Sequence, residues 1–324
     1  MLVSVLLFAV GLVLLIKGGD WFVDGATGLA KRFNLPDIVV GATVVSIGTT
    51  LPEVMVSTTG ALAGSGAMAY GNAIGSIICN TSLIAAISIT CNPGPVNVKS
   101  MKTPAIFFFL SAAIYCMAAY GLGTFPRWLG FVMLTIFVIY MVMTVRNGLK
   151  NPDSAAEEEE EDSKPKALWQ ELLLLIIGAA VIAVGADLLV EHGQVIAIGL
   201  GGPETVVALL FVALGTSLPE LVTTITSLKK GRASLGVGNV IGANIFNLVL
   251  VSGVAVSLAP FDVPVENTLL NTGLNLSLVF DIPVMLGVMS LMIFPALAKK
   301  KLSRWQGIAL LCIYAAFCVC QFTL

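Results

Sequence analysis

The sequence predicts an all-α polytopic membrane protein with ten transmembrane helices, arranged as two inverted-topology repeats of five helices each. Three observations lead to this prediction: an apolar composition, ten apolar stretches long enough to span a bilayer, and a motif that occurs twice. Of the 324 residues, 57% are hydrophobic and only 11% are charged, and the mean hydropathy is +0.97. This composition excludes an ordinary soluble domain.

The ten apolar stretches define the expected spans. A helix needs about 20 predominantly apolar residues to cross a hydrocarbon core of roughly 30 Å. The N-terminal stretch lacks the basic region and cleavage site of a secretory signal, so we take it as the first span. The spans are expected to begin near Leu2, Val39, Ala69, Thr103, Trp128, Leu168, Thr205, Leu235, Ile282 and Trp305.

Positive charge predicts the orientation of the chain. Fifteen Lys and Arg residues fall in loops after odd-numbered spans, and Arg127 alone falls in a loop after an even-numbered span. Because loops rich in Lys and Arg stay in the cytoplasm, both termini are expected outside and the central linker inside. The protein is then an integral protein of the cell (inner) membrane.

A repeated motif divides the chain into two halves. The sequence GTTLPE at residues 48–53 recurs as GTSLPE at 215–220, and the same offset of 167 aligns GNAIG at 71–75 with GNVIG at 238–242. In this register, 15 of the 43 positions from Gly41 to Leu83 are identical in the second half. Since each half holds an odd number of spans, the second must cross the membrane in the opposite sense, an arrangement typical of secondary transporters.

The predicted domains follow from this repeat. Residues 1–149 form the first five-helix repeat, residues 150–167 an acidic cytoplasmic linker, and residues 168–324 the second, inverted repeat. The linker contains the run EEEEED at 157–162, and such a block of like charge is expected to be a solvated tether.

The repeated motif places an acid, Glu53 or Glu220, within an apolar stretch of each half. An ionisable side chain in a membrane span is costly and is by default a functional-site hypothesis. Because proline removes a helical hydrogen bond, Pro52 and Pro219 are expected to break their helices near residues 46–48 and 213–215. Each Glu follows a Thr by four residues, so carboxylate and hydroxyl share a helical face.

Together these groups predict a cage of hard oxygen ligands. Carboxylates, hydroxyls and amide oxygens suit calcium, sodium and magnesium and do not suit zinc or copper, and calcium fits a crowded protein cage better than magnesium. For Asn72 and Asn239, ligation and interhelical hydrogen bonding are both open. The proposed cation-binding side chains are Glu53, Glu220, Thr49, Thr50, Thr216, Ser217, Ser76, Asn80 and Asn247.

With both motifs present in register, the chain resembles the calcium/cation antiporter superfamily, in particular prokaryotic sodium/calcium exchangers. The resemblance covers nearly the whole chain and implies cation sites between the second, third, seventh and eighth helices. It places the backbone carbonyl ligands on Ser46 and Ala213. Two positions depart from some relatives: Ala243 stands where a Ser would match Ser76, and Asn247 stands where some carry Asp, which puts a serine-based side sodium site in doubt and disfavours potassium coupling.

The function expected from this resemblance is secondary active antiport of calcium against sodium by alternating access, with the long first and sixth helices sliding across the other eight. The ions are ligands and no cofactor is expected; a monomer in the lipid bilayer is expected to suffice, without nucleic acid.

Two other functions stay open. A calcium/proton antiporter would use the same two glutamates, because two protons neutralise them as well as one calcium ion or two sodium ions do. A cation channel is a more remote alternative, since pores usually draw acids from several subunits. We expect no enzyme, because the single histidine, His192, has no catalytic partner motif.

The six cysteines lie in apolar contexts without metal-ligand spacing and are expected to be buried thiols: Cys79, Cys91, Cys116, Cys312, Cys318 and Cys320.

Overall fold

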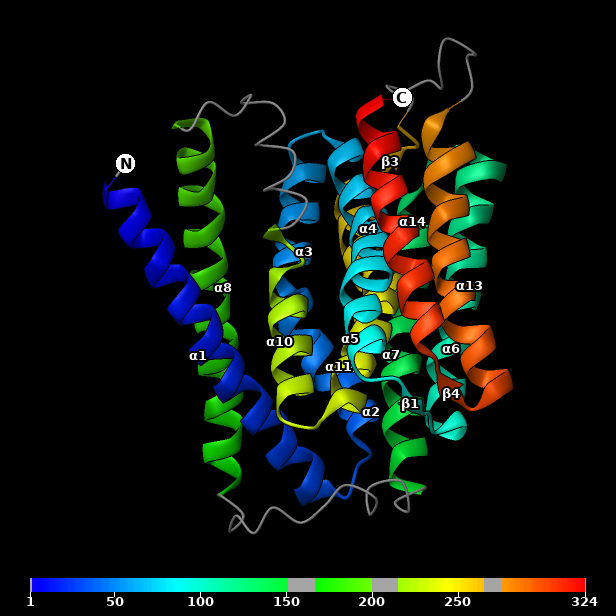
Figure 1. The fold of residues 1–324 in the computed structure, drawn as a ribbon. Coiled ribbons are helices and arrows are strands. Elements are labelled where there is room, and N and C mark those ends of the chain that lie inside the picture. The colour runs from blue at the N-terminus through cyan, green and yellow to red at the C-terminus, as the bar shows by residue number, and fades with distance from the viewer. Residues whose placement is uncertain (1, 151–166, 200–214, 265–274, 324) are drawn as a thin grey trace.

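The computed structural model describes residues 2–150, 167–199, 215–264 and 275–323. These residues are almost entirely helical (Figure 1). Within the described ranges, nine helical segments are long and apolar enough to cross a membrane, and they begin within about five residues of nine of the predicted starts. The start of the seventh predicted span, near Thr205, lies outside the described residues.

The first half supplies five of these spans, and three of them contain a π-helical segment (η). In chain order they are α1 (Leu2–Phe33); α2 (Asp37–Val40), η1 (Gly41–Val45) and α3 (Ser46–Leu62); α4 (Gly66–Cys79), η2 (Asn80–Ala85) and α5 (Ala86–Cys91); α6 (Val98–Cys116) and η3 (Met117–Leu122); and α7 (Arg127–Lys150).

The second half follows the same plan. Its described elements are α8 (Leu168–Gly199); α10 (Leu218–Lys229); α11 (Ala233–Phe246), η5 (Asn247–Val251) and α12 (Ser252–Leu258); η7 (Ser277–Asp281) and α13 (Ile282–Lys299); and α14 (Arg304–Thr323).

Two short antiparallel sheets display the inverted symmetry. Strand β1 (Gly94–Pro95) pairs with β4 (Lys301–Leu302), and β2 (Thr124–Phe125) pairs with β3 (Phe261–Asp262). β1 and β3 are related by the same offset of 167 residues as the motifs, and each pairs with a strand of the other half. The β1–β4 sheet lies at one end of the molecule and β3 at the other (Figure 1), as a two-fold axis in the membrane plane requires.

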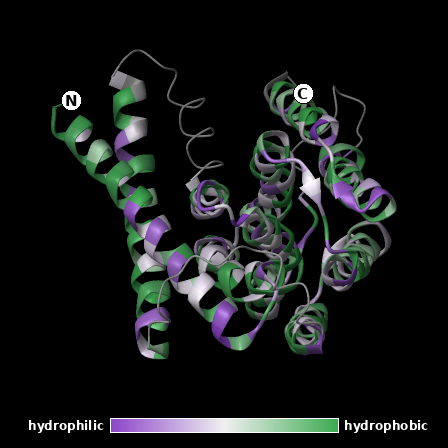
Figure 2. Cartoon of the chain, turned by 60° about the horizontal axis from the view of Figure 1, so that its bottom comes forward, coloured by the Kyte–Doolittle hydropathy of each residue, from purple (hydrophilic) through white to green (hydrophobic). Residues whose placement is uncertain are grey.

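The beginning of α1 and the end of α14 lie at the same end of the molecule, opposite the end of α7 and the beginning of α8 (Figure 1). Figure 2 shows hydrophobic residues along the helices at the periphery of the molecule, as expected for helices that face lipid. Side chains such as Val13 on α1 and Ile176 on α8 are 58% and 67% exposed.

Helices α1 and α8 form an antiparallel pair at one side of the molecule (Figure 1), and α1 also packs on α10. Glycines at seven-residue intervals bring their backbones together, as small residues do between helices in lipid. A Cβ atom added at Gly25 would lie 2.6 Å from the carbonyl oxygen of Glu171, and one at Gly18 would lie 2.9 Å from the amide nitrogen of Ile182. The glycines in this interface are Gly11, Gly18 and Gly25 on α1 and Gly178 and Gly185 on α8.

The hydrophobic core reflects this division. Its largest cluster lies among α4 to α7 and α11 to α14, where Tyr140 contacts Phe107 and Phe246 edge to face. A second cluster centres on the α1–α8 pair, with Phe22 and Ile182 at 0% and 1% exposure. The pair therefore has its own packing and meets the rest of the protein along a separate seam.

Two sequence-based expectations need correction. The expected break at residues 46–48 is wrong: α3 runs as an α-helix through Pro52, and the backbone changes register one turn earlier, in η1. Buried thiols are confirmed for Cys79 and wrong for Cys91 and Cys312, which are exposed. An apolar context does not separate protein-facing from lipid-facing positions, because lipid is as apolar as the core.

The glycine interface yields a prediction about stability. Gly25→Ala should destabilise the protein, because the new Cβ would overlap the backbone of α8. Gly287→Ala on α13, where a Cβ would meet no described atom within 4 Å, is the matched control and should be neutral or stabilising, since Ala favours a helix over Gly by about 1 kcal/mol. Thermal unfolding in detergent measures both, and equal melting temperatures would refute the close α1–α8 contact.

Candidate functional site

The structure contains four buried acidic side chains in its described part, and they form two classes. Glu171 and Asp37 are 2% and 7% exposed, and each pairs with an arginine: Arg32 at 2.9 Å and Arg232 at 3.2 Å. Glu53 and Glu220 are 0% exposed, and neither takes part in a salt bridge among the described residues.

The two unpaired acids share one environment. Glu53 lies on α3 and Glu220 on α10; these two helices contact each other, and the two carboxylates are close enough to repel. The side chains of Thr49 and Thr50 lie beside the Glu220 carboxylate. Sequence positions 167 residues apart therefore meet in one site, as the inverted repeat predicts.

The packing of the helices crosses between the halves. Helix α3 contacts η5, which begins at Asn247, and α10 contacts η2, which begins at Asn80. Each glutamate-bearing helix thus packs on the amide-bearing segment of the opposite half. π-helical turns occur frequently at functional sites, and here two of them start at the matched asparagines.

The site gathers oxygen atoms that have no protein partner. Both carboxylates, two hydroxyls and two amides contribute eight buried side-chain oxygens without a hydrogen bond in the described part. Calcium takes six to eight oxygen ligands at about 2.3–2.6 Å, whereas buried polar groups are normally satisfied. The eight atoms belong to Glu53 and Glu220 (two each), Thr50, Ser217, Asn80 and Asn247.

Local contacts orient these groups. Asn247 donates its Nδ2 hydrogen to the carbonyl of Ala243 at 3.1 Å, which leaves its Oδ1 atom free. Ser217 lies beside Cys79, the residue that precedes Asn80. Asn72 donates to the carbonyl oxygen of Glu53 at 3.1 Å and to Ser57 at 2.8 Å, and so holds α4 against α3.

The remaining predicted ligands are placed differently. Ser76 lies on the buried face of α4 and is 4% exposed, whereas Thr216 is half-buried and lines a cavity outside the carboxylate pair. The Ser46 hydroxyl donates within the protein, with the Gly41 and Asn239 carbonyls at 2.8 and 2.9 Å. Ala213, the second predicted carbonyl ligand, lies outside the described residues.

The sequence does not decide between ligation and hydrogen bonding for Asn239, and it does not predict the Arg32–Glu171 and Arg232–Asp37 contacts. The Oδ1 atom of Asn239 accepts a hydrogen bond from Thr49 at 3.1 Å. The alignment of Asn239 with Asn72 in the repeated motif is the sequence feature that indicates a role for it. The arginine pairs have no comparable signal, because they join residues that only the tertiary fold brings together.

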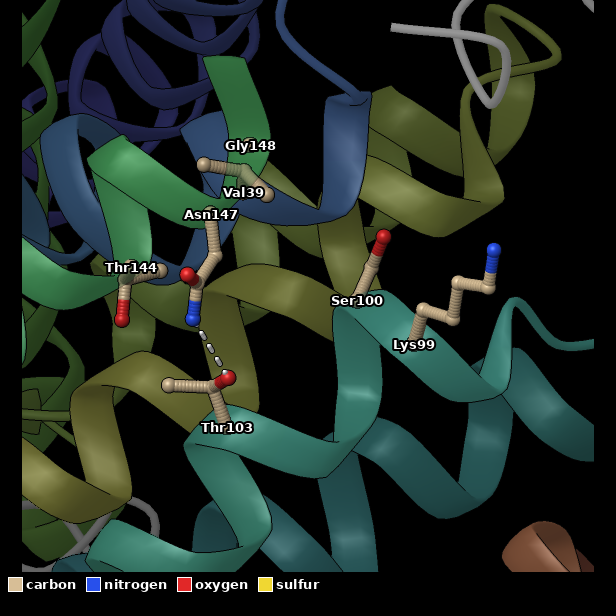
Figure 3. A pocket seen from close by; sticks show the side chains of 7 residues that line it. All are labelled: Val39, Lys99, Ser100, Thr103, Thr144, Asn147 and Gly148. Carbon is tan, nitrogen blue, oxygen red and sulfur yellow. Dashed lines mark hydrogen bonds between the residues drawn. The ribbon is translucent and has the colours of Figure 1, made fainter. Parts of the chain in front are cut away.

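Two cavities in the described part of the chain differ in volume and in the residues that line them. One, of about 1190 Å³, separates α8 from α3 and from the start of α10, and Gly48, Pro52 and Thr216 are among the residues that line it. The other, of about 20 Å³, holds no acid and lies between α6 and α7, where Asn147 donates to Thr103 at 3.1 Å (Figure 3). Of these two cavities, the large one borders the helices that carry the two glutamates.

Comparisons with known proteins identify close likenesses. The family model described as "Sodium/calcium exchanger protein" matches residues 3–146 and 171–323. An uncharacterised membrane protein of Methanocaldococcus jannaschii is 35% identical over 95% of this chain and 94% of its own. The sodium/calcium exchanger MaX1 of Methanosarcina acetivorans is 29% identical, with 99% of both chains covered.

Solved structures agree with these matches. A structure of the sodium-calcium exchanger NCX_Mj, soaked with sodium and strontium, superposes with a TM-score of 0.79 at 33% identity and covers 97% of both chains. The inner membrane protein YrbG of Escherichia coli is a further relative, 32% identical over 81% of this chain and 82% of its own.

The unpaired acids give a prediction for the protein free of metal ions. Glu220→Gln should raise the melting temperature in sodium-free buffer with chelator, because it removes one of two buried charges that repel each other. The exposed Glu191→Gln is the control and should leave the melting temperature within about 1 °C, since surface substitutions change stability little. A lower melting temperature for Glu220→Gln would show that the carboxylate has a stabilising partner.

Proposed function

The chain belongs to the sodium/calcium exchanger family, and from this premise we propose that it exchanges calcium for sodium across the membrane at one cation site between Glu53 and Glu220. The observation that carries the proposal is the pair of fully buried carboxylates, which have no cationic partner among the described residues. A buried charge without an opposite charge strongly destabilises a protein. The two carboxylates therefore require a cation from solution.

The ligand set of the proposed cage consists of oxygen atoms alone. The carboxylates supply two negative charges, which one calcium ion or two sodium ions neutralise. Neutral ligands complete the shell: Thr50, Ser217, Asn80 and Asn247 offer free oxygens, and Thr49, Thr216, Ser76 and the carbonyls of Ser46 and Ala213 are further members of the proposed set. Such a hard-oxygen shell favours calcium and sodium over softer metals.

Coupling follows from the cost of an empty site. Closing the cage around two bare carboxylates would take both out of water without compensation, so only a loaded site should pass through the occluded state. A sodium gradient and an inside-negative potential, worth about 2.3 kcal/mol per charge per 100 mV, would then drive calcium outward. The ions are substrates, and the proposal needs no cofactor and no second subunit.

Sodium is the proposed counter-ion, with the calcium/proton antiporter as the alternative. By resemblance, proton-coupled members tend to carry a Glu shortly after the Gly-Asn pair, and this chain has Ile74-Gly75 and Ile241-Gly242 there. Asn247, in place of Asp, argues against potassium coupling. The relative MaX1 is named a sodium/calcium exchanger, which supports the same choice.

The packing of α1 and α8 supports alternating access by movement of that pair. The pair carries none of the proposed ligands and has its own hydrophobic cluster, and the large cavity lies between α8 and the helices α3 and α10. The Arg32–Glu171 salt bridge ties α1 to α8. Lys230, after α10, instead reaches across the seam to Asp24 of α1 at 2.7 Å.

We also propose the orientation given by the charge bias, with both termini outside and the linker in the cytoplasm. In that orientation the Lys230–Asp24 contact lies at the cytoplasmic end and belongs to one of the two access states. A cation channel would need no such moving pair.

Transport assays test the proposed function. Calcium-45 uptake into sodium-loaded vesicles should be abolished by Glu53→Gln and by Glu220→Gln, while Asp262→Asn, an exposed acid on β3, should retain it. Sodium, potassium or a pH gradient is then offered as the only driving ion. Uptake driven by pH with sodium inert would establish the proton alternative, and normal uptake in both Gln variants would eliminate the site.

Cross-linking tests the moving pair in a background without native cysteines. A short cross-link in Asp24→Cys/Lys230→Cys should stop transport, because it fixes α1 to the α10–α11 turn. The same reagent in Arg32→Cys/Glu171→Cys should leave transport largely intact, because both residues belong to the pair. If the first cross-link forms and transport continues, the pair does not slide at this end.

A further inference from the structure

Asn239 contacts the proposed ligand Thr49. Its own side-chain oxygen is not among the eight unbonded oxygens of the site. It lies on α11 and is 0% exposed. Its Oδ1 atom accepts from the Thr49 hydroxyl at 3.1 Å and lies 3.3 Å from the Ser46 hydroxyl, while its carbonyl oxygen lies 2.9 Å from the same Ser46 group. The side chain thus joins the second half of the protein to the helix that carries Glu53.

The hydrogen bond from Thr49 to Asn239 determines the direction of the Thr49 hydroxyl hydrogen. A hydroxyl has one hydrogen to donate and two lone pairs. Thr49 also lies beside the Glu220 carboxylate, which is a stronger acceptor than an amide. If Thr49 gave its hydrogen to Glu220, the hydrogen would lie between the two oxygens and an arriving cation would have to displace it. With the hydrogen on Asn239, both oxygens face the cation with free lone pairs.

We propose that Asn239 is a positioning residue that holds the Thr49 hydroxyl hydrogen away from Glu220 and thereby sets the affinity of the site for divalent cations. The inference rests on the proposed function, since it concerns the same cation site. Asn239 acts through Thr49 and does not itself coordinate the ion.

The inverted repeat supports a role confined to one side of the site. The symmetry mate of Asn239 is Asn72, which donates to the Glu53 carbonyl and to Ser57 and contacts none of the ligand hydroxyls. The position that matches Ser46 is Ala213, which has no hydroxyl. The Thr49–Asn239 contact therefore has no counterpart at Asn72, although Glu53 and Glu220 are related by the inverted repeat.

The test is a double-mutant cycle on calcium transport. Asn239→Leu should raise the KM for calcium roughly tenfold, the size expected for one hydrogen bond to a charged site, with a much smaller change in the maximal rate. Thr49→Val should also raise KM. The double variant should be no worse than Thr49→Val alone, because Asn239 has no effect once the hydroxyl is absent. Asn239→Ala, which adds no bulk, replaces the Leu variant if that variant does not fold.

The matched control is Asn244→Leu on the same helix. Asn244 is also 0% exposed and donates across the halves to Thr81 at 2.7 Å, but Thr81 is not a proposed ligand. This variant should lose stability without the tenfold rise in KM.

Three results would overturn the inference: KM effects of Asn239 and Thr49 variants that multiply, an Asn239 variant that lowers the maximal rate alone, or an equal KM rise in Asn244→Leu. Absence of sodium-driven calcium uptake by the unmodified protein would instead refute the proposed function, so the two failures are distinguishable.

Discussion

Two carboxylates are buried together without a counter-charge from the described part of the chain, and this is the constraint on which the structure depends. A membrane protein that buries an acid usually neutralises it, as Arg32 and Arg232 do for Glu171 and Asp37. Glu53 and Glu220 have no such partner within the described ranges, and their charges repel. The fold holds them together because each helix that carries one packs on the opposite half, so separating the acids would require breaking the interface between the repeats.

The same constraint explains the division of the molecule into two bodies. The proposed exchange requires a rigid frame for the site, which the large hydrophobic core supplies, and access to the site from either side. The α1–α8 pair has close backbone packing within itself and a cavity against the site helices. Its glycines keep the pair together, and the ion pairs at its end determine how it meets the frame. In the proposed mechanism, rigidity and movement therefore belong to different helices.

Much of this arrangement is readable from the sequence. The repeated motif predicts the meeting of Glu53 and Glu220, because the constant offset and the odd number of spans define a two-fold relation. The π-helical starts at Asn80 and Asn247 are not predictable in this way, since a change of hydrogen-bond register depends on tertiary packing. Pro52 misled the prediction: its missing N–H frees only one carbonyl, and the helix continues. The buried arginine pairs join residues 139 and 195 positions apart, beyond any local pattern.

The central claim is that Glu53 and Glu220 hold one divalent cation between them. Anomalous scattering from crystals of the purified protein soaked in strontium, an electron-rich substitute for calcium, tests it most directly. We expect a single strong peak between the two carboxylates, within contact of Asn80 and Asn247, that weakens as sodium is added and is absent in Glu53→Gln crystals. A strontium peak elsewhere in the molecule, with none between these acids, would contradict the account.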